Sequence, residues 1–436
     1  MKNKLELGSI IELECVEITY EGLGKCFYQD KPIFVLGLFI NEKALVKVTK
    51  ILSKYCFGSI YKYLSASHKR EKIDLFYTIS GSAPLYGLDY EEQLKLKTEL
   101  INKFFNWKYP NLLDNKIEIE KSLNKTHYRN KSRFVVKKVN NKNCLFSYEF
   151  NTNNLIKVND CPIVDNKNLF RKICDILTKL DSYEKLDVYE IIGRIYDKNN
   201  YSLRINVNND RISISELKNI INDENGLLKI EIRGRKNNLL FSNETNLAKP
   251  VISLYNRNFI VDINSFFQID TQTFSKIIED VNNYINLNNK HLIDLYCGVG
   301  TLGICLYNEK FSIYGIEIDK IAIETADQNL RINNISSDKS KYIVGDAKNI
   351  KRENFDFSKT TLILDPPRSG IDKELINKIL EWKPQQLIYI SCDFKTQLRD
   401  LEFLLQDYKI EFYKGYDIFA QTMHFETVAI LNLKNK

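Results

Sequence analysis

The stretch HLIDLYCGVGTLG, residues 291–303, decides the fold of this chain. Its apolar start predicts a buried strand, and glycines follow at positions 298, 300 and 303 in the spacing Gly-x-Gly-x-x-Gly. Glycines allow the backbone to turn sharply and to approach a ligand closely. A strand that passes through such a loop into a helix is typical of an α/β nucleotide-binding sheet.

The same rhythm continues from about residue 263 to the end of the chain. Four more apolar strands are expected, at Ser312–Ile318, Lys341–Val344, Thr360–Leu364 and Gln386–Ser391. Helical patterns separate the strands, at Ile304–Tyr307, Lys320–Asn333, Asp372–Trp382 and Lys395–Leu405, and the tail Glu426–Leu433 predicts a further strand. Strands that alternate with helices predict an α/β, doubly wound parallel sheet.

Two regions with different patterns of polar and apolar residues precede this sheet. Residues 1–62 alternate polar and apolar residues between tight turns, which predicts a small antiparallel β-barrel with strands at Ser9–Ile18, Gly24–Tyr28, Pro32–Val35 and Ala44–Lys50. Residues 63–262 mix helical stretches with β-type runs and lack a clean βαβ order, so an α+β region is expected. Residues 263–436 then form the doubly wound domain.

Length and composition restrict the class of protein. The chain has 436 residues, 27% of them charged and 44% hydrophobic, which excludes a disordered tail and a small disulfide scaffold. No apolar run approaches the ~20 residues of a membrane span, and the polar start does not resemble a secretion signal. A cytoplasmic protein is therefore expected, in which the nine cysteines are free thiols, metal ligands or a nucleophile and do not form disulfides. The net charge of +7 permits a polyanionic partner.

The glycine loop predicts a cofactor that contains a nucleoside. Glu317 ends the next strand, about 20 positions beyond the loop, where a carboxylate accepts hydrogen bonds from ribose hydroxyls. NAD and S-adenosylmethionine both satisfy this pattern. Asp294 either binds the amino group of S-adenosylmethionine or caps the turn.

Two further motifs end at the same edge of the sheet. Asp365 begins Asp-Pro-Pro-Arg, and its prolines fix the chain where doubly wound folds bind ligands, although a stiff turn alone would look the same. Cys392 follows the fifth strand and is either a nucleophile or a small buried residue. Cys297, within the glycine loop, is expected to serve in packing.

Glu426 opens the apolar tail strand. A carboxylate at that place is partly desolvated, so its pKa should rise, which suits a proton acceptor. The alternative is a charge that keeps an edge strand soluble. His424 is a second candidate base, or simply makes a hydrogen bond.

Together these motifs resemble those of the RNA (uracil-5-)-methyltransferase family. The matching residues are Asp294–Gly300, Glu317, Asp365–Arg368, Ser391–Asp393 and 424–427, with weaker matches at Phe266–Gln268 and Tyr128–Lys131. The first 60 residues resemble a TRAM domain, a small OB-like RNA-binding barrel. The resemblance covers nearly the whole chain, and the order of the motifs is specific where a single motif is not.

The resemblance implies a Rossmann-like class I methyltransferase domain that uses S-adenosylmethionine to form 5-methyluridine in RNA. Cys392 would add to carbon 6 of uracil, and Glu426 would remove the proton from carbon 5. Phe266 and Arg368 would contact the RNA, whose target base must leave its stack. The residues that would contact the cofactor are Gln268, Tyr296, Gly298, Glu317, Asp346 and Asp365.

The chain departs from the family pattern at two places. Many relatives hold an iron–sulfur cluster on four cysteines, whereas Ser80, Ala83 and Asp74 stand at three of those places here and only Cys161 remains. One thiolate cannot hold such a cluster, so no cluster and no other metal is expected. Ala420 replaces a proline before the last motif, which is expected to loosen the loop that leads to Glu426.

Three functions remain open at this point. The first is RNA uracil-C5 methylation by a monomer, with 23S rRNA favoured by the TRAM-like barrel and tRNA as the alternative. The second is a dinucleotide-dependent oxidoreductase, which leaves Cys392 and Glu426 unexplained. The third is an RNA-binding protein without activity. The sequence names neither the RNA nor the uridine.

Overall fold

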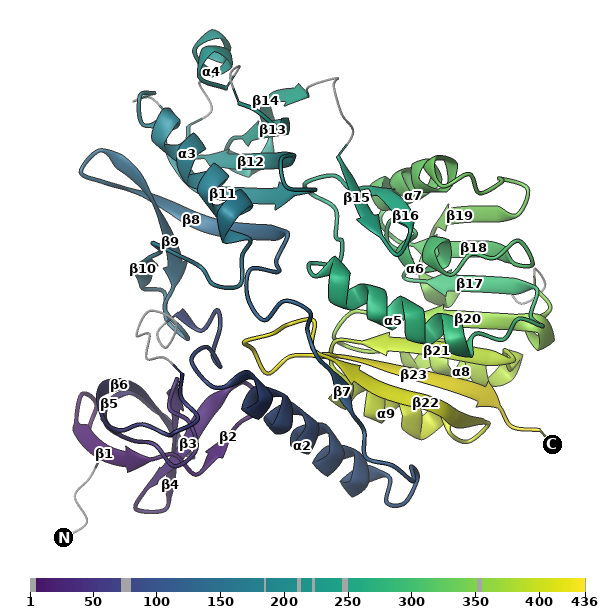
Figure 1. Cartoon of the computed structure of the whole chain (residues 1–436), viewed down its shortest axis with the longest axis horizontal. Coiled ribbons are helices and arrows are strands. Elements are labelled where there is room, and N and C mark those ends of the chain that lie inside the picture. Colours follow the sequence, from purple (N-terminus) through teal and green to yellow (C-terminus); the bar gives the residue numbers. More distant parts are fainter. Residues whose placement is uncertain are drawn as a thin grey trace.

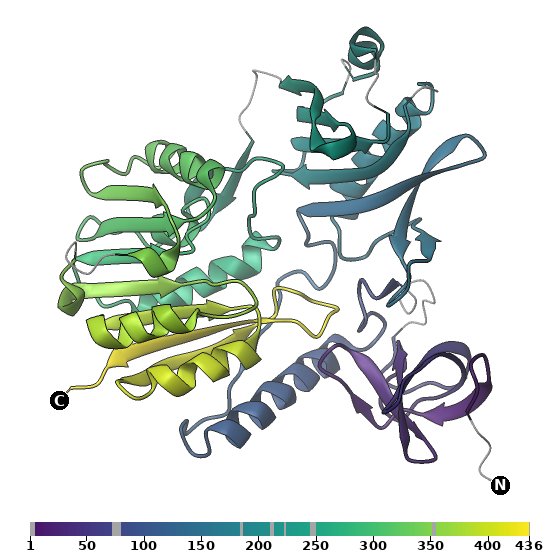
Figure 2. The ribbon, with the colours of Figure 1, turned by 180° about the vertical axis from the view of Figure 1, so that it is seen from behind.

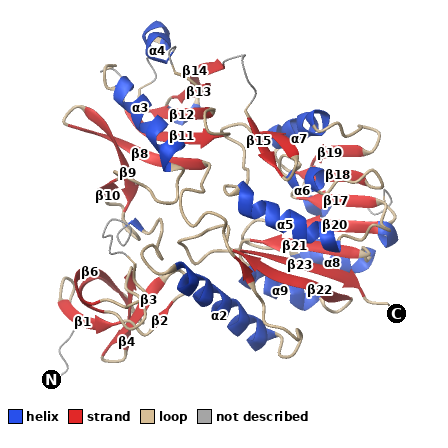
Figure 3. Ribbon diagram, in the orientation of Figure 1, coloured by secondary structure: helices blue, strands red, loops and turns tan. Residues whose placement is uncertain are grey.

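The structure is a computed structural model that describes residues 5–71, 80–183, 186–209, 213–221, 224–244, 250–350 and 355–435. Its strands form three large sheets of six, seven and eight strands and one two-stranded hairpin. Figure 3 shows the sheets as separate groups of strands joined by loops. Among the described residues, no helix has the length and apolar character that a membrane span requires.

The first sheet has the strand order β1-β5-β6-β4-β3-β2 and curls around its own apolar core (Figure 1). The strands are β1 (Ile10–Glu14), β2 (Glu17–Ile18), β3 (Leu23–Tyr28), β4 (Lys31–Leu36), β5 (Lys43–Ile51) and β6 (Cys56–Ser65). The sequence predicts one strand over Ser9–Ile18, but the structure divides it. The sequence pattern also misses β6. Gly58 interrupts the alternation of polar and apolar residues in this strand. The structure requires glycine at this position, because a Cβ there would lie 2.3 Å from a side-chain carbon of Val46.

The second sheet has the order β10-β9-β8-β11-β12-β13-β14. The strands are β8 (Lys131–Val139), β9 (Lys142–Tyr148), β10 (Leu155–Lys157), β11 (Val188–Ile195), β12 (Tyr201–Val207), β13 (Leu227–Arg233) and β14 (Leu239–Glu244). The helices beside it are the π-helical η1 (Asn166–Phe170), α3 (Arg171–Leu180), α4 (Ile214–Ile221) and the 3-10 turn η2 (Arg235–Asn237). Gly193 of β11 permits close approach of Leu169 and Ile173, which would lie 2.7 and 2.8 Å from a Cβ.

The third sheet confirms the doubly wound α/β prediction. Its order is β19-β18-β17-β20-β21-β23-β22-β7, and its first five strands are parallel. The strands are β7 (Ile119–Glu120), β17 (His291–Leu295), β18 (Ser312–Glu317), β19 (Ser340–Val344), β20 (Thr360–Leu364), β21 (Gln386–Ser391), β22 (Tyr408–Tyr416) and β23 (Glu426–Leu433).

Helices cover both faces of this sheet. One face carries α5 (Thr271–Tyr284), α6 (Thr301–Cys305) and α7 (Lys320–Ile332). The other face carries α2 (Tyr90–Lys108), α8 (Lys373–Trp382) and α9 (Phe394–Leu404), which lie in front in Figure 2. Two 3-10 turns complete the domain, η3 (Ala347–Asn349) and η5 (Phe357–Lys359).

The last two long strands differ from the predicted parallel order. The sequence does not predict β22, and β23 inserts between β21 and β22 in an antiparallel sense. The first six residues of β23 are all buried, as expected for an interior strand. Glu426 therefore does not lie on an edge strand, so the reading of it as a solubility charge is wrong.

Several contacts cross the domain boundaries that the sequence predicts at residues 62 and 262. The strand β6 extends to Ser65, and β7 joins the third sheet. The hairpin of β15 (Val251–Leu254) and β16 (Arg257–Ile260) packs on α7, where Asn329 Oδ1 accepts a bond of 2.7 Å from Ile260 N. We propose limits near residues 65 and 250, with α2 and β7 belonging to the third sheet although they precede the second sheet in the chain.

Candidate active site

The glycine loop after β17 is tightly turned. Tyr296 and Gly300 have φ angles of 65° and 83°, and a Cβ at Gly300 or Gly303 would lie 2.9 Å from Tyr342 Oη. Gly298 differs, because no atom lies within 4 Å of the position of its missing Cβ. The loop is therefore closed by packing on one side and open for a ligand at Gly298.

Asp294 resolves the choice between an amino-group ligand and a cap. Its Oδ2 accepts a hydrogen bond of 2.9 Å from Gly303 N, so this carboxylate closes the turn. Its Oδ1 is buried without a partner within the described structure. Burial, with smaller contributions from the charges of Asp365 and Glu317, raises the pKa of Asp294 to about 8.

Replacement of Asp294 by Asn is expected to weaken the pH dependence of stability. The native carboxyl keeps a proton that the unfolded chain releases, so stability falls as pH rises from about 4 to about 8. We expect the wild type to lose more unfolding free energy between pH 5 and pH 8 than Asp294→Asn, as measured by urea denaturation without ligand. The exposed Asp338→Asn is the matched control, and equal slopes for wild type and Asp294→Asn would refute the assignment.

The ends of β18 and β19 offer a surface beside this loop. Glu317 is half-buried, and its Oε2 accepts a bond of 3.2 Å from Gly298 N. Asp346 starts the turn η3 and is partly exposed. Between them, Ile318 and Val344 are 72% and 51% exposed, which is unusual for large apolar residues at strand ends. Their place suits a flat apolar ring. The sequence does not single out either residue, because an apolar residue at the end of a strand normally belongs to the core.

Cys392 and Glu426 lie together at the carboxyl edge of the sheet. The register pairs Ser391 of β21 with Thr427 of β23, so that the residues next to this pair, Cys392 and Glu426, are neighbours. Thr427 Oγ1 donates a bond of 3.1 Å to Ser391 O, which ties the two strand ends together. Asp365 directly follows the adjacent strand β20. Three motifs far apart in sequence thus meet at one place.

The carboxyl groups at this edge of the sheet influence one another's pKa values. Burial, and then the charge of Asp365, raise the pKa of Glu426 well above its ordinary value, while Arg368 opposes that shift. Burial also raises the pKa of Asp365. Glu426 is only 7% exposed, and its Oε2 has no partner within the described residues. A buried carboxyl whose pKa is raised by its surroundings is a candidate for proton transfer.

Cys392 is a half-buried thiol in the same field. Burial, followed by the charges of Glu426 and Asp365, raises its pKa to about 11. Arg368 acts in the other direction, through its charge and a hydrogen bond to the thiol. The thiol is therefore protonated in the free protein at neutral pH, and the positive charge of Arg368 favours its reactive thiolate form.

The segment before α5 places neighbouring residues in opposite environments. Phe267 is buried and packs on Phe259 with ring centroids 5.6 Å apart, whereas Phe266 is 74% exposed. Gln268 is 8% exposed, and its carbonyl accepts a bond of 2.9 Å from Asn130 Nδ2. The two weaker motifs of the sequence are thus in direct contact, and Phe266 remains free to stack.

A buried ion pair holds the chain that leads to Glu426. Lys97 of α2 donates to Asp417 Oδ1 at 2.5 Å and to His424 O at 3.2 Å. Tyr90 donates to the other carboxylate oxygen of Asp417 at 2.8 Å. Lys97 and Asp417 are both fully buried. No sequence pattern singles out Lys97, because a lysine in an amphipathic helix is normally exposed.

The same loop is anchored at Ala420, where a looser chain is expected from the sequence. Ala420 is fully buried, and its carbonyl accepts a bond of 2.9 Å from Tyr128 Oη. The next residue, Gln421, accepts a bond of 2.9 Å from Gln93 Nε2. Contacts from α2 and from Tyr128 thus hold this loop, and the loosening expected at Ala420 stays a prediction.

Lys97→Met is expected to lower the unfolding free energy by about 3–5 kcal/mol, since it leaves Asp417 buried without its ion pair. Asp417→Asn in the same chain should recover part of this loss. Urea denaturation measures both effects, with the exposed Lys95→Met on α2 as the matched control. A loss for Lys97→Met no larger than for Lys95→Met would show that the pair does not stabilise the fold.

The structure describes three of the four positions at which relatives carry iron–sulfur cluster ligands. Ala83 and Cys161 lie in the apolar core of the central region, and Ser80 Oγ lies 2.9 Å from Ser82 Oγ, while Asp74 falls outside the described residues. Among the described residues, no group of three or more His, Cys, Asp or Glu is arranged to hold a metal. The absence of a cluster stays a prediction.

Comparisons with known proteins give the family of this chain. Residues 89–434 match the family model of tRNA (uracil-5-)-methyltransferases. The chain is 27% identical over 455 residues to an uncharacterized RNA methyltransferase of Enterococcus faecalis (strain ATCC 700802 / V583), with 99% of each chain covered. It is 27% identical over 465 residues to another from Staphylococcus aureus (strain MRSA252), again with 99% of each covered.

A solved structure shows the same fold. The crystal structure of Pyrococcus abyssi tRNA (uracil-54, C5)-methyltransferase in complex with S-adenosyl-L-homocysteine has a TM-score of 0.75 and 18% identity, over 97% of this chain and 100% of that chain. This likeness confirms the class I methyltransferase architecture. Since the family model spans most of the chain, the protein belongs to the tRNA (uracil-5-)-methyltransferase family and is an S-adenosylmethionine-dependent RNA methyltransferase.

Proposed function

We propose that this enzyme methylates carbon 5 of a uridine in 23S rRNA through a covalent bond between Cys392 and carbon 6 of the base. One observation carries the proposal: Cys392, directly after β21, is the neighbour of Glu426 at the start of β23, and the buried Glu426 Oε2 has no partner within the described residues. Membership of a uracil-5 methyltransferase family supports the same reaction and argues against an oxidoreductase.

S-adenosylmethionine, when bound, supplies an electrophilic methyl group. The open space at Gly298, the carboxylate of Glu317 and the exposed apolar residues at the ends of β18 and β19 fit a nucleoside at this edge. The residues that we propose to hold the cofactor are Gln268, Tyr296, Gly298, Glu317, Asp346 and Asp365.

The protein side chains act on the uracil ring in two stages. Cys392 first loses its thiol proton to solvent, a loss that Arg368 favours. The thiolate then forms a bond to carbon 6 and pushes electrons onto carbon 5, which is otherwise a poor nucleophile. After carbon 5 has gained its methyl group, Glu426 takes the proton from carbon 5. The electrons of that C–H bond re-form the C5–C6 double bond, and the bond to sulfur breaks. Its raised pKa makes Glu426 a stronger base than a solvated carboxylate.

The RNA contacts follow from exposure and charge. Phe266 presents a free ring on which a base can stack, and the exposed Arg368 offers a cation to phosphate or base. We also propose that the six-stranded barrel is a TRAM-like RNA-binding domain and that the enzyme acts as a monomer.

A second RNA is also a candidate substrate for this enzyme. The barrel favours 23S rRNA, whereas the family model is described by tRNA and the solved P. abyssi enzyme is a tRNA (uracil-54, C5)-methyltransferase. tRNA is therefore the alternative substrate for the same reaction.

The test incubates the pure enzyme with labelled S-adenosylmethionine and, separately, unmodified 23S rRNA and tRNA transcripts, followed by nucleoside analysis. We expect 5-methyluridine in the rRNA and none with Cys392→Ala. 5-Methyluridine in tRNA alone would transfer the function to the second candidate. Bound cofactor with no methyl transfer to either RNA would overturn the proposal in favour of an inactive RNA-binding protein.

A further inference from the structure

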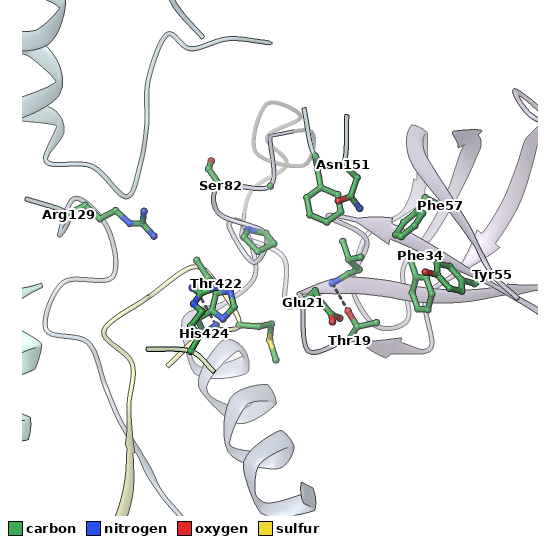
Figure 4. Close-up of a pocket in the computed structure, with 16 residues that line it drawn as sticks. Thr19, Glu21, Phe34, Tyr55, Phe57, Ser82, Arg129, Asn151, Thr422 and His424 are labelled. Carbon is green, nitrogen blue, oxygen red and sulfur yellow. Dashed lines mark hydrogen bonds between the residues drawn. The ribbon is translucent and has the colours of Figure 1, made fainter. Parts of the chain in front are cut away.

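A cavity of about 760 Å³ lies between the barrel, the central region and the loop before Glu426 (Figure 4). Its size suits a ligand as large as a nucleotide. The barrel side is lined by Thr19, Glu21, Leu23, Phe34, Tyr55 and Phe57. The other sides include Arg129 of the central region and, from the catalytic domain, Arg368 and His424.

Three aromatic rings form the barrel wall of this cavity. Phe34 of β4 and Phe57 of β6 are paired across the sheet, and Tyr55 precedes β6. Their ring centroids are 5.5 to 6.0 Å apart. None of the three is buried, although large aromatic side chains usually are. We call Phe34, Tyr55 and Phe57 the aromatic triad.

Two arginine side chains line the cavity on the side away from the aromatic triad. Figure 4 shows Arg129 on the side opposite Phe34 and Phe57, with His424 between them. The Nε of Arg129 is buried and has no hydrogen-bond partner within the described structure. Arg368 also lines the cavity and lies close enough to Cys392 to lower the pKa of that thiol, so the cavity adjoins the proposed nucleophile.

The barrel is packed directly against the catalytic edge. The ring of Tyr20 lies 5.7 Å from that of Phe394 and 6.1 Å from that of His424, measured between centroids. Lys395 Nζ lies 3.7 Å from the centroid of Tyr20. Because Phe394 and Lys395 begin α9 immediately after the Cys392 motif, these contacts fix the distance from the aromatic triad to the nucleophile.

We propose that this cavity binds unpaired nucleotides next to the target uridine, with a base stacked on the aromatic triad and the backbone beside Arg129 and Arg368. Aromatic rings stack on bases that are splayed out, and basic groups track the backbone, whereas paired bases hide their faces. The substrate class is thus a single-stranded or looped RNA segment, not a continuous duplex. This inference rests on the proposed function, because the cavity is argued to serve the RNA that is methylated at Cys392.

The test measures equilibrium binding of a fluorescent single-stranded RNA of about 12 nucleotides with one central uridine, at fixed salt. A hairpin that pairs the nucleotides on both sides of the same uridine is the second probe. We expect the wild type to prefer the single strand, and Tyr55→Ala and Phe57→Ala to raise the Kd for it about 5- to 100-fold. The Kd for the hairpin should change little.

Tyr61→Ala is the matched control, since Tyr61 is a 64% exposed aromatic residue of β6 that does not line the cavity. Thermal unfolding of each variant verifies the fold, and Arg129→Gln provides a second variant outside the barrel, for which weaker binding is also expected. Equal single-strand Kd values for wild type, the two triad variants and Arg129→Gln would overturn the inference, as would equal effects of Tyr61→Ala and Phe57→Ala.

Methyl transfer to the full transcripts separates this inference from the proposed function. Methylation by the wild type with an unchanged KM for RNA in the triad variants would refute the cavity assignment alone. Triad-dependent binding of the single strand, without methylation of any transcript, would support the cavity and refute the proposed reaction. We expect methylation by the wild type and a KM for RNA that rises in parallel with the Kd.

Discussion

Cys392→Ala is expected to reduce methyl transfer to RNA by at least about 10³-fold, because a covalent pathway has no substitute for its nucleophile. Binding of S-adenosylmethionine should be retained, since the thiol lies beside the proposed cofactor site and not in the glycine loop. The rate of 5-methyluridine formation at saturating RNA measures the effect. Cys144→Ala, a half-buried cysteine of β9, is the matched control and should keep full activity.

A trapped adduct tests the same residue independently of turnover. An RNA with 5-fluorouridine at the target carries fluorine where the proton must leave, so the bond from sulfur to carbon 6 persists once carbon 5 is methylated. The wild type should then migrate with the RNA on a denaturing gel, and Cys392→Ala should not. Activity of Cys392→Ala near that of the wild type would refute the covalent pathway.

Glu426→Gln is expected to reduce turnover by about 10²- to 10⁴-fold, the usual range for loss of a positioned base. The expected signature differs from that of Cys392→Ala. Because Cys392 is intact, the bond to carbon 6 and the methyl transfer still occur, but the carbon 5 proton remains and sulfur is not released. The variant should therefore accumulate a methylated covalent complex with unmodified uridine RNA, with no more than one methyl group per enzyme.

Glu411→Gln is the matched control for this variant, since Glu411 is an exposed carboxylate on the neighbouring strand β22. Its turnover should equal that of the wild type. If Glu426→Gln turned over slowly without forming any covalent complex, Glu426 would act before the attack of Cys392 and not as the base for carbon 5.

The sequence alone determines the doubly wound domain and names the candidates for the reacting groups. In residues 291–303 an apolar strand, a glycine loop and a helix follow one another, and this local order can be read directly from the chain. The same holds for β20 and β21, whose apolar runs end at Asp365 and just before Cys392. Parallel strands share one carboxyl edge, so their motifs meet wherever such a sheet forms.

Only the tertiary structure decides how these groups are tuned. The neighbours Cys392 and Glu426 depend on insertion of β23 beside β21, a pairing across the sheet that no local pattern records. The raised pKa of Glu426 likewise arises from burial and from Asp365 on another strand. The buried Lys97 and the aromatic triad are invisible in the sequence for the same reason. A residue's burial and charge environment depend on distant segments, whereas its strand or helix follows from its immediate neighbours.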